Sequence, residues 1–138
     1  THPFVSVYEA YKKSGPNVLG VEALQGDDGC TGVKVNTADG YADYLFSATD
    51  MQAHHPSKRV SFCGGLGLIR EKEGQIQLMY LGCGRSLKKG NFVLESDHDV
   101  YAAIYMQHGV WYYSATGPVR VKIGKETKEL NEGYNQKL

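Results

Sequence analysis

Two short runs that contain histidine are the first candidates for a metal or catalytic site in this sequence. The runs are His54-His55 and Asp97-His98-Asp99. Neighbours on a strand point to opposite faces, so without a suitable loop geometry neither run offers a ready bidentate pair of metal ligands. The carboxylates of the second run, or of Asp27-Asp28, offer oxygen ligands for calcium. The alternative is that they are ordinary loop residues, and we predict no metal ion.

Nucleophilic catalysis would need a serine, cysteine or threonine beside a base, and the sequence contains no Gly-x-Ser-x-Gly elbow. The glycine-rich stretch Cys63-Gly64-Gly65-Leu66-Gly67 lacks the Gly-Lys-Ser/Thr ending and the following helix of a phosphate loop. It predicts a tight bend or bulge between two strands. We therefore expect no catalytic residue and no cofactor. A complete small enzyme would require His54, His98 or His108 to meet a tyrosine or carboxylate in a pocket.

Three cysteines, Cys30, Cys63 and Cys83, lack the paired short spacing of a zinc site. An odd number allows at most one internal disulfide, and three buried thiols are the alternative. No metal site is predicted from them.

The tyrosines give a more specific indication. A two-residue turn at His108-Gly109 pairs Tyr105 with Tyr112 across a hairpin. That register places Tyr101 beside them on one face and assigns the other face to the core, with Val100, Ile104, Met106, Trp111 and Tyr113. A three-residue turn would pair Tyr105 with Trp111 instead.

A tyrosine row of this kind is a flat, partly polar surface on which sugar rings can stack. The alternative is that the tyrosines cover a sandwich face or contact a neighbouring domain. Residues 58–89 add seven basic and two acidic side chains to a chain of zero net charge, an excess that attracts anionic partners. A solvated set of strand edges and turns would explain the same excess. The candidate carbohydrate-binding residues are Tyr101, Tyr105, Tyr112, Arg85, Lys88 and Lys89.

Strands must position these residues, because side chains of alternating polarity recur along the chain, as in Val119–Ile123. Between them lie turn signals such as Asp39-Gly40, Glu73-Gly74 and Lys89-Gly90. One helical turn is predicted at Ala48–His54, ended by Pro56. The predicted strands are Phe4–Tyr11, Val18–Leu24, Thr31–Asn36, Ala42–Phe46, Arg59–Phe62, Leu66–Arg70, Ile76–Gly82, Asn91–Glu95, Val100–Met106, Val110–Ala115 and Val119–Ile123.

The chain of 138 residues is 41% hydrophobic and is long enough to bury the core of one domain. The strands and turns predict an all-β fold, an antiparallel β-sandwich of about ten to twelve short strands, with a closed barrel as the competing architecture. Residues 1–124 would form the sandwich, and 125–138 a polar C-terminal strand or tail. Apolar runs are too short for a membrane span, and we expect no nucleic-acid partner.

Four segments together resemble the C-terminal β-domain of heparinase II/III-like polysaccharide lyases. The opening Thr1-His2-Pro3-Phe4-Val5-Ser6-Val7-Tyr8-Glu9-Ala10-Tyr11 resembles the strand that enters this domain. Asp43–Phe46, Phe62–Arg70 and Leu81–Leu87 then resemble its later strands in the same order. The resemblance covers most of the chain.

The resemblance implies a β-sandwich behind an α/α toroid, in an enzyme that cleaves uronic-acid-containing polysaccharides by β-elimination. The proton-transferring tyrosine and histidine of such enzymes lie mainly in the toroid and the adjoining central sheet, so no catalytic residue is carried over. The first hypothesis is thus a non-catalytic accessory module, secreted or periplasmic, that supports the parent chain's catalytic domain or binds acidic polysaccharide. The second is a cell-surface structural or adhesion sandwich domain that binds protein.

Overall fold

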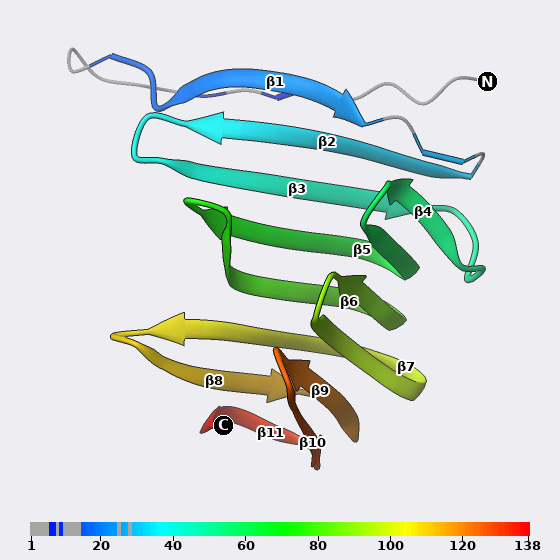
Figure 1. Ribbon diagram of the computed structural model, residues 1–138. Helices are drawn as coiled ribbons and strands as arrows, with labels where there is room; N and C mark the ends of the chain where they lie inside the picture. The colour runs from blue at the N-terminus through cyan, green and yellow to red at the C-terminus, as the bar shows by residue number, and fades with distance from the viewer. Residues whose placement is uncertain (1–5, 8, 10–14, 25, 28) are drawn as a thin grey trace.

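A computed structural model (Figure 1) describes residues 6, 7, 9, 15–24, 26, 27 and 29–138. These residues contain eleven strands and no helix, and every strand pairing is antiparallel. The all-β prediction is confirmed. The strands are β1 (Val18–Leu24), β2 (Cys30–Thr37), β3 (Tyr41–Ala48), β4 (His54–Ser57), β5 (Val60–Lys72), β6 (Gln75–Lys89), β7 (Phe92–Gln107), β8 (Val110–Ala115), β9 (Val119–Ile123), β10 (Glu126–Leu130) and β11 (Gly133–Lys137).

Three long strands, β5, β6 and β7, run through both layers of the sandwich. One part of each pairs within the order β1-β2-β3-β5-β6-β7-β8-β11. The other part pairs with β4 on one side and with β9 and then β10 on the other. Figure 1 shows β4, β9 and β10 crossing in front of the larger layer. A single hydrogen-bonded sheet thus folds over itself to form a larger and a smaller layer.

The fold-over occurs where β5 and β6 approach each other at two glycines. The pairing register shifts between Cys63 and Gly64, and it shifts again on both sides of Gly84. A Cβ atom on Gly84 would lie 2.7 Å from the carbonyl oxygen of Cys63 and 2.8 Å from the Cα of Gly64. Cys83 has a φ of 49°, in the left-handed region. The absence of side chains at the two glycines therefore lets the strands bend together.

The core fills the space between the two layers. Inward residues of the smaller layer, such as Phe62, Leu87 and Leu94, are fully buried. They belong to the same cluster as Met79 and Ile104 of the larger layer. Alternation along the strands therefore gives each layer one apolar inner face, as expected for a sandwich.

Most predicted strand positions are confirmed, but some predicted boundaries are wrong. The predicted strands Arg59–Phe62 and Leu66–Arg70 fall in one strand, β5, which begins at Val60, and the glycine-rich stretch between them forms the expected bulge. The predicted strands Asn91–Glu95 and Val100–Met106 likewise fall in one strand, β7, which begins at Phe92. The prediction of a strand at Phe4–Tyr11 lies largely outside the described residues.

The predicted helical turn at Ala48–His54 is wrong. Residues 49–52 form bends, and His54 begins β4. Pro56 lies within this strand, which is at the edge of the smaller layer, where a missing backbone donor is tolerated. The segment 125–138 contains β10 and β11.

Substitution of Gly84 by alanine tests the bend. The new methyl group would contact backbone atoms that cannot move without shifting β5, and we expect a loss of about 3 kcal/mol of unfolding free energy in urea. Gly20→Ala is the matched control, because its Cβ would meet only the Asn36 side chain, at 3.9 Å. Equal stability of the two variants would contradict the role assigned to this glycine.

Candidate functional site

The hairpin of β7 and β8 brings two of the predicted tyrosines together. Tyr105 pairs directly with Tyr112, and their rings stack with centroids 5.9 Å apart and planes 17° apart. His108 and Gly109 have φ values of 50° and 76°, which confirms the two-residue turn. The Tyr105 hydroxyl donates a hydrogen bond to Asn135 Oδ1, and the backbone N–H of Asn135 donates to Ser114 Oγ. Strand β11 therefore fixes one edge of the pair.

Tyr101 lies four residues before Tyr105 on the same outward face of β7, and it is 54% exposed. A line of residues paired across successive strands extends this face to β3: Leu45, Leu68, Tyr80 and Ala103. Leu45 and Leu66 are exposed. The sequence analysis missed these residues, although alternation along the strands predicts that they face outward. The outward surface of the larger layer is thus partly apolar.

The three predicted basic residues lie elsewhere, and each contacts a carboxylate. Arg85 lies at the bend, and its Nε is 2.8 Å from Asp99 Oδ1. Lys88 is on the outward side of the smaller layer, with its Nζ 2.8 Å from Glu95 Oε2. Lys89 points between the layers, where it pairs with Glu71 and lies 4.0 Å from the centroid of the Tyr44 ring. The structure therefore does not gather the six predicted residues into one site.

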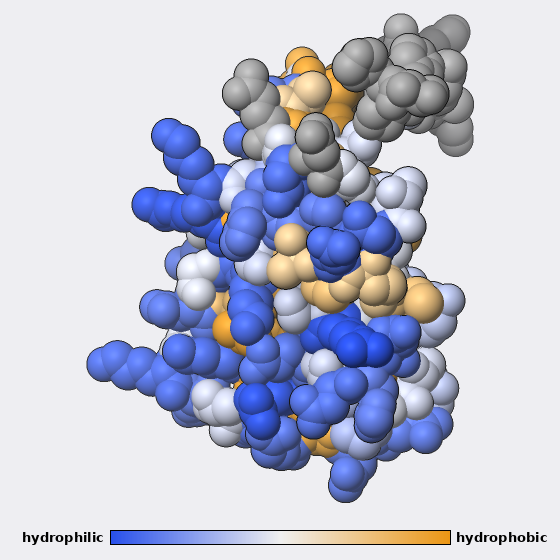
Figure 2. Space-filling model, turned by 90° about the vertical axis from the view of Figure 1, so that its right-hand side faces the viewer, coloured by the Kyte–Doolittle hydropathy of each residue, from blue (hydrophilic) through white to orange (hydrophobic). Residues whose placement is uncertain are grey.

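A polar hollow of about 490 Å³ covers part of the smaller layer's outward face. Arg120 bridges two carboxylates there, with Nη1 3.2 Å from Glu95 Oε1 and Nε bonded to Glu129. The hydrogen bond from Lys88 and the one from Arg120 hold the pKa of Glu95 below its ordinary value despite partial burial. The side of the molecule that carries the bend is mostly hydrophilic (Figure 2). Opposite charges on this face are largely paired with one another.

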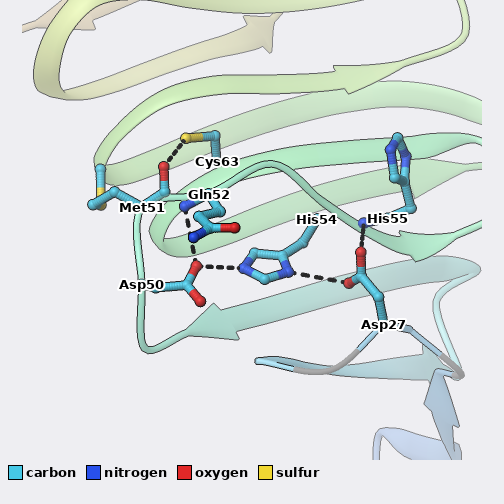
Figure 3. A network of polar contacts seen from close by, with 7 residues as sticks. All are labelled: Asp27, Asp50, Met51, Gln52, His54, His55 and Cys63. Atoms are coloured by element: carbon cyan, nitrogen blue, oxygen red, sulfur yellow. Dashed lines mark hydrogen bonds and ion pairs between the residues drawn. The ribbon is translucent and has the colours of Figure 1, made fainter.

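His54 is buried and is held between two carboxylates (Figure 3). Its Nδ1 lies 3.1 Å from Asp27 Oδ1 and its Nε2 lies 2.6 Å from Asp50 Oδ1. Asp27 also accepts a hydrogen bond from the backbone N–H of His55. Two ring nitrogens facing two carboxylates favour the imidazolium form, because only that form donates from both nitrogens. The cluster connects the β1–β2 loop to the segment before β4.

The shifts of the three pKa values agree with this arrangement. Hydrogen bonding to Asp50 raises the pKa of His54, against the opposing effect of burial. The hydrogen bond with His54 lowers the pKa of Asp50. Desolvation raises the pKa of Asp27, but hydrogen bonds from His55 and His54 outweigh it and bring that pKa below its ordinary value. The ring is buried and both of its nitrogens are bonded to carboxylates from two loops, so we assign the cluster a structural role.

The cysteines are free thiols. Cys63 donates a hydrogen bond from Sγ to the carbonyl oxygen of Met51, at 2.8 Å. Burial, followed by the negative charges of Asp27 and Asp50, raises the pKa of Cys30 to about 11. Such a thiol is a poor nucleophile at neutral pH.

The two layers and the antiparallel pairing define the class of an antiparallel β-sandwich domain. Comparison with known proteins identifies the family. Residues 18–106 match the model of the endo-acting ulvan lyase C-terminal domain. The chain belongs to this family. The match confirms a polysaccharide lyase C-terminal domain, as the resemblance implied, and the family that matches is the endo-acting ulvan lyase C-terminal domain.

A curated relative agrees with the family match. An endo-acting ulvan lyase of Formosa agariphila is 33% identical over 101 residues, which cover 69% of this chain and 12% of the relative. The chain therefore spans a small fraction of the length of that protein. No solved structure matches the chain. The described residues contain no helix long and apolar enough to cross a membrane.

The His54 cluster predicts a specific pH dependence of stability. Because the pKa of His54 is raised, its contribution is complete below the ordinary value of 6.5 and is lost as pH rises through the folded-state value. The pKa values of both aspartates are lowered, so their contribution is present above 3.8 and is lost as pH falls through the lowered values. Stabilisation by the cluster is thus greatest between these two limits.

We expect His54→Gln to reduce the unfolding free energy by about 2 kcal/mol at pH 5.5 and by less at pH 8.5, since glutamine cannot carry the charge. Urea titrations across this range measure the difference. His55→Gln is the control, because that neighbouring side chain is exposed. A penalty for His54→Gln that does not change with pH would contradict the charged cluster.

Proposed function

We propose that this domain is a non-catalytic accessory module of a polysaccharide lyase and that it binds acidic polysaccharide. The stacked pair Tyr105–Tyr112 carries the proposal, because two parallel rings on an outward face form a platform for sugar rings. The family match supports a lyase module over a protein-binding adhesion domain. A polymeric substrate does not cross a membrane, so we place the protein outside the cytoplasm, secreted or periplasmic.

Docking on the catalytic domain of the parent chain is the second candidate function. The observation in its favour is the partly apolar outward surface of the larger layer, where Leu45 and Leu66 are 37% and 46% exposed. Soluble domains commonly cover such surfaces with a partner. The two functions use overlapping parts of one face, and binding measurements separate them.

Polysaccharide binding is predicted to depend on the tyrosines at every salt concentration. Arg85 and Lys88 already contact carboxylates, so their attraction for a polyanion is modest and is screened by salt over a Debye length of about 10 Å at 0.1 M. Stacking changes little with salt. Titration calorimetry with ulvan, heparin, chondroitin sulfate, hyaluronan and alginate measures both effects.

Tyr105→Ala and Tyr112→Ala should each lower affinity about tenfold at low and high salt. Arg85→Ala combined with Lys88→Ala should lower it only at low salt. Tyr134→Ala is the control, since this exposed tyrosine lies outside the stacked pair. If no polysaccharide produces heat with the unmodified protein, the binding role is wrong and docking on the catalytic domain becomes the favoured function.

The parent enzyme is predicted to be a heparinase II/III-like lyase with an α/α toroid. Support comes from the resemblance of the opening segment and of the strands that follow. The coding sequence upstream of the Thr1 codon tests this, and we expect several hundred residues of amphipathic helical repeats. An upstream sequence dominated by β-strand patterns would contradict it, without affecting the binding proposal.

A further inference from the structure

A cleft of about 450 Å³ opens between the layers at the end of the sandwich opposite the bend. The position follows from the pairing: β5, β6 and β7 meet at the bend, and their turns at Glu73-Gly74, Gly90-Asn91 and His108-Gly109 lie at the far end. We propose that this cleft binds a single acidic sugar unit of the polysaccharide. The inference rests on the proposed function and names a second contact site for it, apart from the tyrosine pair.

Trp111 and Phe92 form the aromatic wall of the cleft. The two residues come from different layers, and their rings are 5.9 Å apart with planes inclined by 51°. Trp111 also borders an adjoining cavity of about 250 Å³, lined by apolar residues such as Val121, Ile123 and Leu138. The indole is half-buried between these two spaces. An aromatic plane fixed in this way offers the C–H face of a sugar ring a rigid surface.

The charged residues of the cleft give it an excess of one positive charge. Lys89 and Glu71 pair with each other, and their side chains are 14% and 12% exposed. Arg59 lies at the cleft rim in the β4–β5 turn and is exposed. Within the described part of the chain, no carboxylate lies within ion-pair distance of Arg59. Its guanidinium therefore remains available to an anion from solution.

The ligand chemistry follows from these groups. A guanidinium binds a carboxylate or sulfate through two parallel hydrogen bonds. The side-chain amides of Gln75 and Asn91 also line the cleft and can bind hydroxyl groups. A cavity of this size suits a small ligand. Aromatic wall, cation and amides together select a sugar that carries one acidic group over a neutral sugar.

The cleft can be tested through the single tryptophan of the chain, since its fluorescence reports Trp111 alone. We expect ulvan oligosaccharides or a hyaluronan hexasaccharide to change its emission saturably, whereas uncharged cellohexaose should not. Arg59→Gln should weaken this response about tenfold. Lys58→Gln is the matched control, because it removes the same charge from the same turn without altering a cleft-lining residue. The melting temperature of both variants should match that of the unmodified protein.

Calorimetry run in parallel separates the possible failures. In one outcome, the heat of binding depends on Tyr105 and Tyr112, the tryptophan emission is unchanged, and Arg59→Gln and Lys58→Gln have equal affinities. That outcome would overturn the proposed sugar site in the cleft and leave the proposed function intact. Equal responses to cellohexaose and the acidic oligosaccharides would overturn the acidic specificity. An absence of heat with every polysaccharide would overturn both proposals.

Discussion

The close approach of β5 and β6 at Gly64 and Gly84 is the constraint on which the structure depends. There the Cα of Gly64 lies within 2.8 Å of the position that a Cβ of Gly84 would occupy. Because the strands bend at this point, the same three strands supply the middle of both layers. The hydrophobic residues before and after the bend then face each other, and one continuous core results.

A sandwich made by folding one sheet is joined by backbone at one end and open at the other. At the joined end, backbone pairing holds the layers together. At the open end, side chains must span the gap, and they do so through the Phe92–Trp111 contact and the Lys89–Glu71 pair beside Tyr44. A buried ion pair adds little net stability, because desolvation opposes the attraction. The pair joins an inward residue of β6 to an inward residue of β5, and both side chains line the cleft at this end.

The identity of most strands, the sandwich and the Tyr105–Tyr112 pairing could be predicted from the sequence because they depend on local alternation and on one turn. The His108-Gly109 turn fixes its own register, so the stacked pair follows directly. The continuity of β5 and β7 through their bulges could not be predicted, since a glycine-rich stretch is compatible with either a loop or a bend. The His54 cluster depends on contacts between residues 27 positions apart, and no spacing rule indicates these.

The bend also explains why the predicted cation and aromatic residues separate. Arg85 and Lys88 follow the bend on β6 and so belong to the bend and the smaller layer, whereas Tyr105 and Tyr112 lie in the larger layer. The positions of these residues in the sequence, and the alternation that turns their side chains outward, therefore do not show that the basic residues and the tyrosines lie in different layers. Inward residues differ from outward ones in this respect. Near the open end, inward residues of the two layers point toward each other across the space between the layers. Trp111 of the larger layer and Lys89 of the smaller layer thereby line one cleft. In a folded sheet of this kind, the open end therefore combines aromatic and charged side chains from both layers in the space between them.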